Sequence, residues 1–264
     1  MRILPYSILM SFLLCLGLAA CESSTEPEVQ DEHNLDIPGW ALIWNDEFDA
    51  DSIDLARWIV ADGHWSHNGE LQYYAPDEVY VEDGKLRLRS RVRYYEGQLF
   101  TSGHVHSNYS FQYGRVDIRA KLPATRGMWP ALWMLPANGG WPPEIDILEL
   151  LGHEPTTIHM SVHWGPLPEG VSPWDIGQTA TSGFTGPDFT ADYHVFSLEW
   201  TTDTLRFLID DTERFVTTAG VPHEPMYLIM NTAIGGHWPG SPDETTVWPQ
   251  FHDIDYVRIY ETAQ

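Results

Sequence analysis

Cysteine is almost absent from the sequence. The 264 residues contain only two cysteines, Cys15 and Cys21, and both lie near the N-terminus. The chain after residue 21 therefore has no thiol and no disulfide, so a domain there must be held together by side-chain packing. With 43% hydrophobic and 13% aromatic residues, the chain has enough apolar material for a sizeable core. Its length suits one large domain, because all-β sandwiches of this size usually remain single.

Basic residues are also scarce. The sequence has 14 Lys and Arg against 38 Asp and Glu, a formal net charge of -24. Such a surface repels nucleic acid and anionic membranes, so neither is an expected partner. It also disfavours a heavily sulfated substrate, which would require a basic binding surface. Because salt adaptation or solubility alone would give the same acidity, the charge excludes partners without identifying one.

Long hydrophobic runs are missing as well. The apolar stretch 8–18 is too short for a spanning helix in the mature protein. With Arg2 before it and two alanines after it, this stretch has the pattern of a secretory signal. Residues 18–21 (LAAC) are similar to a bacterial lipobox, in which the cysteine receives a diacylglycerol and cleavage occurs before it. The alternative is an ordinary signal peptide with a cysteine by chance.

The N-terminal pattern predicts three segments. Residues 1–20 are a lipoprotein signal peptide with lipidation at Cys21, and 21–36 are a flexible acidic tether, because they are polar and carry proline. Residues 37–264 are the folded domain. We therefore expect an exported bacterial lipoprotein of the cell envelope or cell surface, which contacts the membrane only through its lipid anchor.

No segment shows a sustained helical stripe with end caps. Residues 79–92 contain two runs around Asp83-Gly84, a dipeptide typical of a β-hairpin. Residues 115–122 alternate between polar and apolar side chains, which predicts a half-buried strand. Many short strands separated by turn residues predict an all-β fold, an antiparallel β-sandwich of the jelly-roll kind. The other expected strands are 145–151, 157–164, 194–200, 205–210, 226–233 and 254–260.

Three carboxylates lie in the apolar segment 144–149, where unpaired charge is costly. On a helix, Glu144 and Glu149 would point about 140° apart. On a regular strand, Glu144 and Asp146 share a face, but an offset of five puts Glu149 on the other. A β-bulge at Ile147 and Leu148 would bring all three onto one face. Side chains leaning inward could then bring the glutamate carboxyls to about 5–5.5 Å, the separation of a retaining glycosidase.

This arrangement predicts a mechanism with two glutamates. Glu144 would be the nucleophile, and Glu149 would protonate the leaving oxygen and then activate water. Asp146 would hydrogen-bond a glutamate and help to separate the two pKa values. The alternatives are a solvated edge strand with scattered acids, or a calcium site.

Two histidines, His159 and His163, lie four residues apart on a predicted strand and so share one face. A zinc site is disfavoured, because the sequence has no HExxH motif and no evident third ligand. We expect His163 to form hydrogen bonds in the substrate cleft, with a satisfied core position as the alternative.

The segment 144–149 (EIDILE) resembles the E-x-D-x-x-E signature of glycoside hydrolase family 16, in its bulged, laminarinase-like branch. The resemblance implies a concanavalin A-like jelly roll, retention of anomeric configuration, endo-cleavage of a β-linked glucan or galactan, and no cofactor for catalysis. Further segments resemble landmarks of this family in the same order: 44–48 (WNDEF), 69–74 (GELQYY), 101–103 (TSG), 113–116 (YGRV), 128–136 (MWPALWMLP), 235–240 (GGHWPG) and 255–258 (DYVR).

The resemblance also implies which side chains surround the cleft. Trp129 and Trp133 lie in a segment similar to the substrate-lining segment of the family, where a ring can stack on a sugar. Trp238, in a glycine-rich loop, is expected to do the same. Asn231 matches an asparagine near the cleft, with a buried amide in the sheet as the alternative.

A structural calcium is a further implication, since related proteins carry one on the convex side. The matching positions are Glu47, the carbonyl of Gly84 and Asp255, all of which offer oxygen donors. Two positions depart from the family pattern at expected substrate contacts. His104 replaces an arginine, and Asn68 is followed by glycine where many laminarinases have a second asparagine. These departures leave the identity of the glycan open.

The combined expectation is a monomeric, retaining endo-β-glucanase that hydrolyses β-1,3 or mixed β-1,3-1,4 glucans. A neutral galactan hydrolase of the agarase or carrageenase type, in the same family, is the first alternative. A transglycosylase would differ only in whether a sugar or water attacks the intermediate. A non-catalytic, glycan-binding surface lipoprotein is the alternative from another class.

Overall fold

The computed structural model describes Leu35 and residues 37–165 and 178–263. The chain divides into two units, residues 1–35 and 36–264. Of the first unit the structure describes only Leu35. The predicted signal peptide, Cys21 and the tether apart from Leu35 lie outside the described residues. In the described part no helix is long and apolar enough to cross a membrane.

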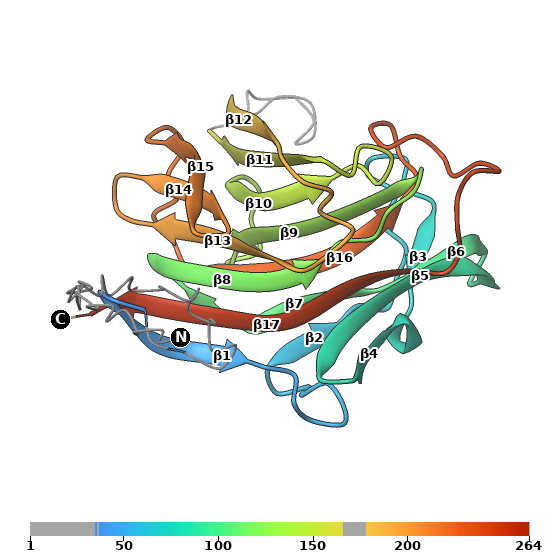
Figure 1. Cartoon of the computed structure of the whole chain (residues 1–264), viewed down its shortest axis with the longest axis horizontal. Coiled ribbons are helices and arrows are strands. Elements are labelled where there is room, and N and C mark those ends of the chain that lie inside the picture. Colours follow the sequence, from blue (N-terminus) through green and yellow to red (C-terminus); the bar gives the residue numbers. More distant parts are fainter. Residues whose placement is uncertain (1–34, 36, 166–177, 264) are drawn as a thin grey trace, which may run out of the picture. The chain divides into compact units, whose positions relative to one another are not determined.

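The larger sheet has ten strands in the order β15-β14-β13-β8-β17-β5-β6-β3, with β1 beside β17 and β4 beside β5 (Figure 1). Its pairs are antiparallel except β3 with β6. The strands are β1 (Trp40–Asp46), β3 (Gln72–Tyr74), β4 (Val79–Glu82), β5 (Lys85–Tyr95), β6 (Gln98–Ser102), β8 (Gly114–Lys121), β13 (His194–Trp200), β14 (Leu205–Ile209), β15 (Thr212–Thr217) and β17 (Gln250–Thr262).

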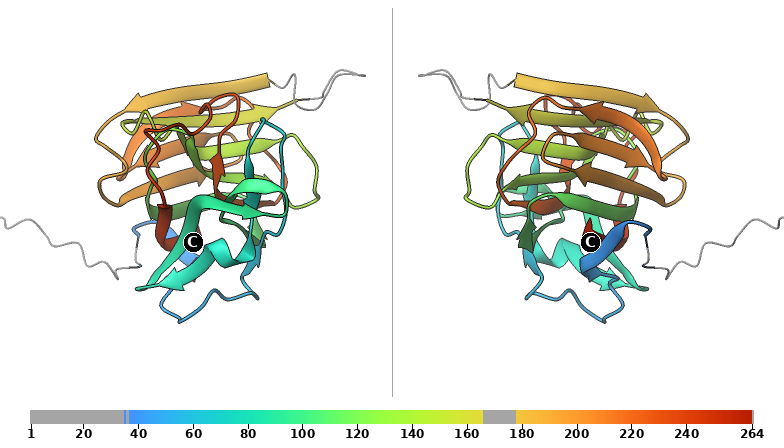
Figure 2. Two further views of the ribbon diagram at one scale, coloured as in Figure 1. Left: turned by 90° about the vertical axis from the view of Figure 1, so that its right-hand side faces the viewer. Right: turned by 90° about the vertical axis from the view of Figure 1, so that its left-hand side faces the viewer.

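The smaller sheet has seven strands in the order β12-β11-β10-β9-β16-β7-β2, which can be followed in Figures 1 and 2. A 3-10 turn, η1 (Pro76–Glu78), precedes β4. The seven strands are β2 (Trp58–Val60), β7 (His104–Phe111), β9 (Met128–Pro136), β10 (Glu144–Leu150), β11 (Thr157–Trp164), β12 (Gln178–Thr185) and β16 (Met226–Ile234).

The core lies between the two sheets and draws side chains from both. Leu86 and Ile118 of the larger sheet and Leu148, Val162 and Met230 of the smaller sheet are fully buried in one cluster. Because side chains alternate along a strand, each strand of the smaller sheet also presents a second set on its outer face, away from this core. The predicted all-β, antiparallel jelly-roll sandwich is confirmed.

The predicted hairpin at Asp83-Gly84 is also confirmed. It joins β4 to β5, and both turn residues have positive φ, 53° and 68°. A two-residue turn of this kind needs positive φ at both positions, which Asp and Gly accept more readily than most residues.

The prediction that 115–122 is half-buried is wrong for the start of the strand. Arg115 and Asp117, on the polar face of β8, are 7% and 4% exposed, whereas Arg119 and Lys121 on the same face are only partly buried. This strand lies between β13 and β17 inside the larger sheet, and neighbouring side chains cover its polar face at Arg115 and Asp117. The Arg115 guanidinium donates hydrogen bonds to Asp117 (2.7 Å), Asp211 (2.6 Å) and Glu199 (3.2 Å). Burial is tolerated here because the charges are paired.

Candidate active site

Strand β10 contains one extra residue relative to both of its neighbours. Against β11, Asp146 lies opposite Ser161, but Glu149 lies opposite His159, one position out of register. The register against β9 shifts in the same interval. Two residues, Ile147 and Leu148, therefore occupy the space that one residue occupies on β11, which is the definition of a β-bulge. The predicted bulge is confirmed.

The bulge places Glu144, Asp146 and Glu149 on one face. Glu144 lies opposite His163 and Glu149 opposite His159, and directly opposed residues of antiparallel strands share a face. His159 and His163 are four residues apart on β11, whose register with β12 is unbroken, so they share a face too. Asp146 shares the face of Glu144 by ordinary alternation. This is the outer face of the smaller sheet.

Each glutamate of the site accepts a hydrogen bond from an indole. Trp129 Nε1 donates to Glu149 Oε1 at 3.0 Å, and Trp141 Nε1 donates to Glu144 Oε2 at 3.1 Å. Trp129 lies on β9, next to β10 in the sheet, and Trp141 lies in the loop before β10. The two tryptophans fix the carboxyl groups and give each one a donor that stabilises its ionised form.

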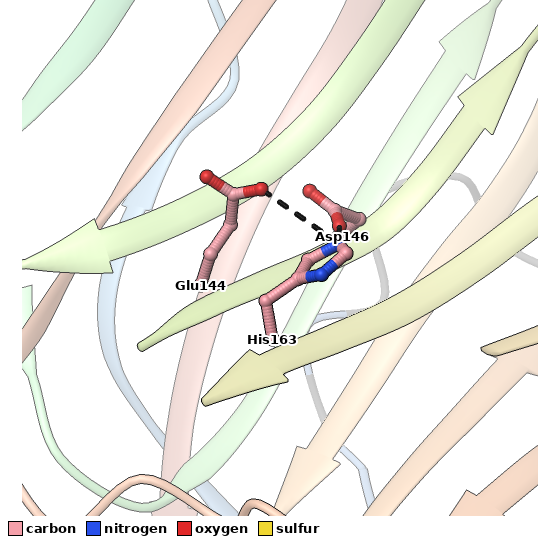
Figure 3. A group of neighbouring side chains, drawn as sticks. All are labelled: Glu144, Asp146 and His163. Atoms are coloured by element: carbon pink, nitrogen blue, oxygen red, sulfur yellow. Dashed lines mark ion pairs between the residues drawn. The ribbon is translucent and has the colours of Figure 1, made fainter. Parts of the chain in front are cut away.

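His163 brings a nitrogen to the other side of the carboxyl group of Glu144. Its Nε2 lies 3.1 Å from Asp146 Oδ2 and 3.9 Å from Glu144 Oε1. Figure 3 shows the three side chains converging from β10 and β11. The other ring nitrogen, Nδ1, lies 2.9 Å from Thr179 Oγ1 on β12, a hydrogen bond that orients the ring. The predicted placement of His163 beside the carboxylates is therefore observed.

Burial is the main cause of raised pKa values in this group. It raises the pKa of Glu144 to about 8, with a further increase from Asp146 and decreases from His163 and the Trp141 hydrogen bond. Burial raises the pKa of Asp146 to about 7. The pKa of Glu149 is raised well above its usual range by burial and then by both Asp146 and Glu144. Burial and the two neighbouring acids therefore favour the protonated form of Glu149, as a general acid requires.

The Trp129 hydrogen bond lowers the pKa of Glu149. Trp129→Phe removes the donor and keeps an aromatic ring, so the pKa of Glu149 should rise. If Glu149 is the general acid, the alkaline limb of the kcat/KM profile reports its pKa in the free protein and should move to higher pH. An alkaline limb that stays in place or moves to lower pH would show that Glu149 is not the group seen in the profile.

The raised pKa of Glu144 also predicts a cost in stability at high pH. Because its folded-state pKa of about 8 exceeds its ordinary value of 4.5, Glu144 favours folding below about pH 4.5. That contribution is lost as the pH rises through about 8. At pH 9, Glu144→Gln should be more stable than the wild type by on the order of 1–4 kcal/mol, and the difference should vanish near pH 4. Urea denaturation at both pH values measures this, and a less stable variant at pH 9 would contradict it.

Trp133 and Asn231 lie next to the carboxylates, but Asn231 is not open to substrate. Trp133 lies opposite Asp146 and therefore on the same face. Its Nε1 donates to Asn231 Oδ1 at 2.7 Å, and Asn231 Nδ2 donates to the Tyr74 hydroxyl at 2.8 Å. Because Asn231 is 7% exposed, the alternative of a buried amide describes it, and its role is to hold the Trp133 ring.

Trp238 is an exposed ring beside Glu149. It is 43% exposed and lies edge to face against Trp129, with centroids 5.6 Å apart, and against His159 at 4.8 Å. Asn68 supports the same loop, because its backbone carbonyl accepts the His237 amide at 2.9 Å. The Trp238 ring thus has an open surface, as expected of a sugar-stacking residue.

His104 is placed beneath other aromatic residues. It is 5% exposed, and its ring contacts those of Trp65 at 4.6 Å and Tyr74 at 5.0 Å. Burial, and then the neighbouring His106, lower the pKa of His104 to about 3, so its ring is neutral. The expected direct contact with substrate does not fit this position. Its neighbour Trp65 is 39% exposed and lies against the His104 ring.

The residues proposed for calcium are paired with arginines. Both oxygens of Glu47 accept hydrogen bonds from Arg258, at 3.0 and 2.8 Å, and Asp255 Oδ2 accepts one from Arg119 at 2.6 Å. Gly84 lies in the β4–β5 hairpin. Calcium takes oxygen ligands of this type, but guanidinium groups already neutralise both carboxylates, so the donor set fits a calcium ion poorly. The calcium site remains a prediction, which melting temperatures with and without a chelator would test.

Sequence reasoning did not identify Trp141, Tyr74, Trp65 or Thr179 as parts of the site. Trp141 lies only three residues before Glu144, and its indole bond to that carboxyl depends on how the loop turns. The other three come from β3, β12 and the loop before β3, which are distant from β10 in sequence. Only the folded chain brings them near the site, Thr179 by strand pairing and Tyr74 and Trp65 by side-chain contacts.

A family model described as Glycosyl hydrolases family 16 matches residues 66–258. The chain is 35% identical to "Beta-glucanase" of Rhodothermus marinus over 86% of this chain and 87% of that protein. It is 31% identical to "Glucan endo-1,3-beta-glucosidase A1" of Niallia circulans, of which it spans 42%. It is also 32% identical to "Keratan-sulfate endo-1,4-beta-galactosidase" of Sphingobacterium multivorum, of which it spans 55%.

Solved structures give the same result for the fold. The laminarinase catalytic domain of Thermotoga maritima superposes with a TM-score of 0.76 at 35% identity, covering 85% of this chain and 99% of that one. The likeness therefore extends over nearly all of the described part of the chain.

Proposed function

The chain belongs to glycosyl hydrolases family 16 and is a glycoside hydrolase, and we propose that it is a retaining endo-β-glucanase acting on β-1,3 or mixed β-1,3-1,4 glucans. The observation that carries the proposal is the bulge in β10, which puts Glu144 and Glu149 on one face with an indole donor on each carboxyl group. Relatives named for β-glucan hydrolysis support the substrate class.

In the first step, Glu144 attacks the anomeric carbon while Glu149 transfers its proton to the departing glycosidic oxygen. The carbon–oxygen bond to the leaving sugar breaks, and an ester between Glu144 and the sugar forms. The different surroundings of the two glutamates suit these roles. Burial is the main cause that raises the pKa of both glutamates, and His163 and one indole act against the rise at each. Two neighbouring acids, Asp146 and Glu144, raise the pKa of Glu149 further, whereas one, Asp146, does so for Glu144.

In the second step, Glu149 is ionised and takes a proton from water as the water attacks the anomeric carbon. The ester to Glu144 breaks, and the second inversion restores the original configuration. Asp146, between the two glutamates, raises the pKa of each, so loss of its charge would lower both values. Raising both pKa values does not separate them, so the role expected of Asp146, a hydrogen bond to a glutamate and a separation of the two pKa values, stays a prediction.

Aromatic rings beside the carboxylates supply surfaces for sugars. Trp133 lies opposite Asp146, and the exposed Trp238 lies against Trp129 at the Glu149 end. A sugar ring presents C–H groups that pack on an indole face, and the indole is large enough to cover it. We propose that Trp133 and Trp238 hold sugars on the two sides of the bond to be cleaved.

Release of new reducing ends from laminarin, mixed-linkage glucan, agarose and carrageenan tests the substrate class. We expect laminarin or mixed-linkage glucan to be the preferred substrate, with oligosaccharides of several lengths appearing early, because endo-cleavage cuts within the chain. Preference for agarose or carrageenan would replace the glucanase proposal by a galactanase. Exclusive release of one short product would contradict endo action.

A galactan hydrolase is the second candidate, and one observation favours it. The relative from Sphingobacterium multivorum is named for keratan sulfate, a β-galactoside. The net charge of -24 opposes a sulfated substrate for this chain, because sulfate groups would be repelled. A neutral galactan is therefore the form of this candidate that the charge allows.

We also propose that the protein is exported and anchored by lipid at Cys21. The support is the sequence pattern alone: a short apolar stretch, two alanines and a cysteine. Cys21→Ser should move the protein from the membrane fraction to the soluble fraction of cells that express the full chain. Equal membrane association of the wild type and the variant would contradict lipid anchoring.

A further inference from the structure

Three side chains of the site direct ligand atoms towards a common point. A carboxylate oxygen of Glu144, one of Asp146 and a ring nitrogen of His163 all lie within 4.8 Å of one another (Figure 3). The mixture of one imidazole and two carboxylates, from β10 and β11, is a ligand set that binds zinc in proteins. In the proposed mechanism, Glu144 and Asp146 act on the sugar and on each other's ionisation, and neither binds a metal ion.

The spacing of these atoms suits a small dication. With metal–ligand bonds of about 2.0–2.1 Å, a tetrahedral ion separates its ligand atoms by about 3.3 Å. His163 Nε2 is 3.1 Å from Asp146 Oδ2 and 3.9 Å from Glu144 Oε1. Small side-chain rotations would therefore bring all three atoms to bonding distance without a change in the sheet.

Two features of the surroundings favour an ion at this position. Asp146 is 4% exposed, and its Oδ2 accepts no hydrogen bond from the described residues, although His163 Nε2 lies 3.1 Å away. A buried carboxylate oxygen without a donor is costly, and a cation would satisfy it. On the other side of His163, Nδ1 bonds to Thr179 Oγ1, the type of second contact that orients a metal-binding imidazole.

We propose that Glu144, Asp146 and His163 form an inhibitory site for a transition-metal dication of the Zn²⁺ type. The ion binds the carboxylate that the proposed mechanism uses as nucleophile, so occupied protein cannot form the glycosyl ester. Sugar and ion compete, because both need Glu144. Calcium and magnesium ions should bind only weakly here. Calcium prefers six or more oxygen ligands, magnesium keeps several of its waters, and both gain little from an imidazole. The inhibitory effect rests on the proposed function, whereas the binding of the ion does not.

Calorimetric titration of ZnCl₂ into the full chain without an affinity tag, with Cys15→Ser and Cys21→Ser to remove the two zinc-binding thiols, tests the site. Excess MgCl₂ in the buffer occupies non-specific acidic positions on this highly charged protein. We expect one Zn²⁺ per chain, and an affinity at least about tenfold lower in His163→Gln and in Glu144→Gln, because each loses a ligand. His153→Gln is the matched control, since His153 is also near a carboxylate, Glu154, at 3.8 Å, but has no third ligand.

Unchanged Zn²⁺ binding in His163→Gln, or loss of binding in His153→Gln, would overturn the proposal. A wild-type titration without a one-site isotherm would overturn it too. Inhibition of hydrolysis by Zn²⁺, reversed by chelator and relieved as the glucan concentration is raised, is the expected result for activity. If no glucan is hydrolysed, the titration still shows whether Zn²⁺ binds. Failure of the metal-site proposal and failure of the proposed function can therefore be distinguished.

Discussion

Glu144→Gln should abolish measurable hydrolysis of the glucan, lowering kcat on the order of 10⁴-fold or more, as loss of a nucleophile does in other enzymes. Glutamine has the shape of glutamate and keeps an oxygen for the Trp141 indole, so the fold and the sugar contacts should remain. It cannot form the ester with the anomeric carbon. Initial rates of reducing-end release measure the loss, and binding of an oligosaccharide by calorimetry measures what is retained.

Azide distinguishes the nucleophile from any other essential group. In Glu144→Ala the space beside the anomeric carbon is open, and azide can attack there, giving a glycosyl azide of inverted configuration from a substrate with a good leaving group. The sugar–oxygen bond breaks, the aryl oxide leaves, and the azide nitrogen bonds to carbon. Formation of this inverted azide is the expected result. An azide product of retained configuration would assign the nucleophile elsewhere.

Glu149→Gln should lower hydrolysis of polysaccharide by about 10²–10⁴-fold, the usual contribution of a general acid. The departing sugar oxygen needs a proton, and glutamine has none to transfer. An aryl glycoside whose leaving group needs no protonation should lose far less in the first step. The ratio of the two losses, from initial rates with both substrates, is the measurement.

A matched control for Glu149→Gln is Glu154→Gln, five residues along the chain on the exposed surface, with a side chain 51% exposed. It should keep wild-type activity. If Glu149→Gln left polysaccharide hydrolysis intact, Glu149 would not be the acid. If the wild type bound glucan but released no reducing ends, the non-catalytic, glycan-binding alternative would be correct for this chain.

The bulge could be predicted because a strand can place Glu144, Asp146 and Glu149 on one face only if it contains an inserted residue. An offset of two and an offset of five cannot share a face unless one residue is inserted, and the registers of β10 against both neighbours show that insertion. The predicted bounds of the strands at 157–164 and 194–200 match the observed ones, since polar and apolar residues largely alternate along each segment. Local alternation was sufficient in these cases.

Features that depend on neighbouring strands could not be predicted in the same way. The alternation in 115–122 correctly indicated a strand, but it could not show that Arg115 would be covered and paired with Asp211, which is 96 residues away. The same limit applies to Asn231. Its amide joins Trp133 to Tyr74, 157 residues away in the chain, and only the assembled sheets bring these groups together.

Several strands also escaped prediction, namely β1, β2, β3, β6, β7, β9, β12 and β15. Four of them, β1, β2, β3 and β6, are three to seven residues long and contain too few alternations to distinguish a strand from a loop, so pairing with distant strands decides their conformation. The burial of His104 could not be predicted either, because it depends on contacts with residues distant in the sequence. Its place in the sequence after Thr-Ser-Gly suggested a cleft residue, but Trp65, from a loop, covers it.

The configuration of the first-formed reducing end is the most direct test of two carboxyl groups acting together on one face. Proton NMR of the products in the first minutes of hydrolysis, before mutarotation, resolves the α and β anomers. The arrangement of Glu144 and Glu149 on the bulged strand predicts the β anomer, because two inversions restore the starting configuration. A first product in the α form would mean that water attacks directly, and it would contradict a covalent role for Glu144.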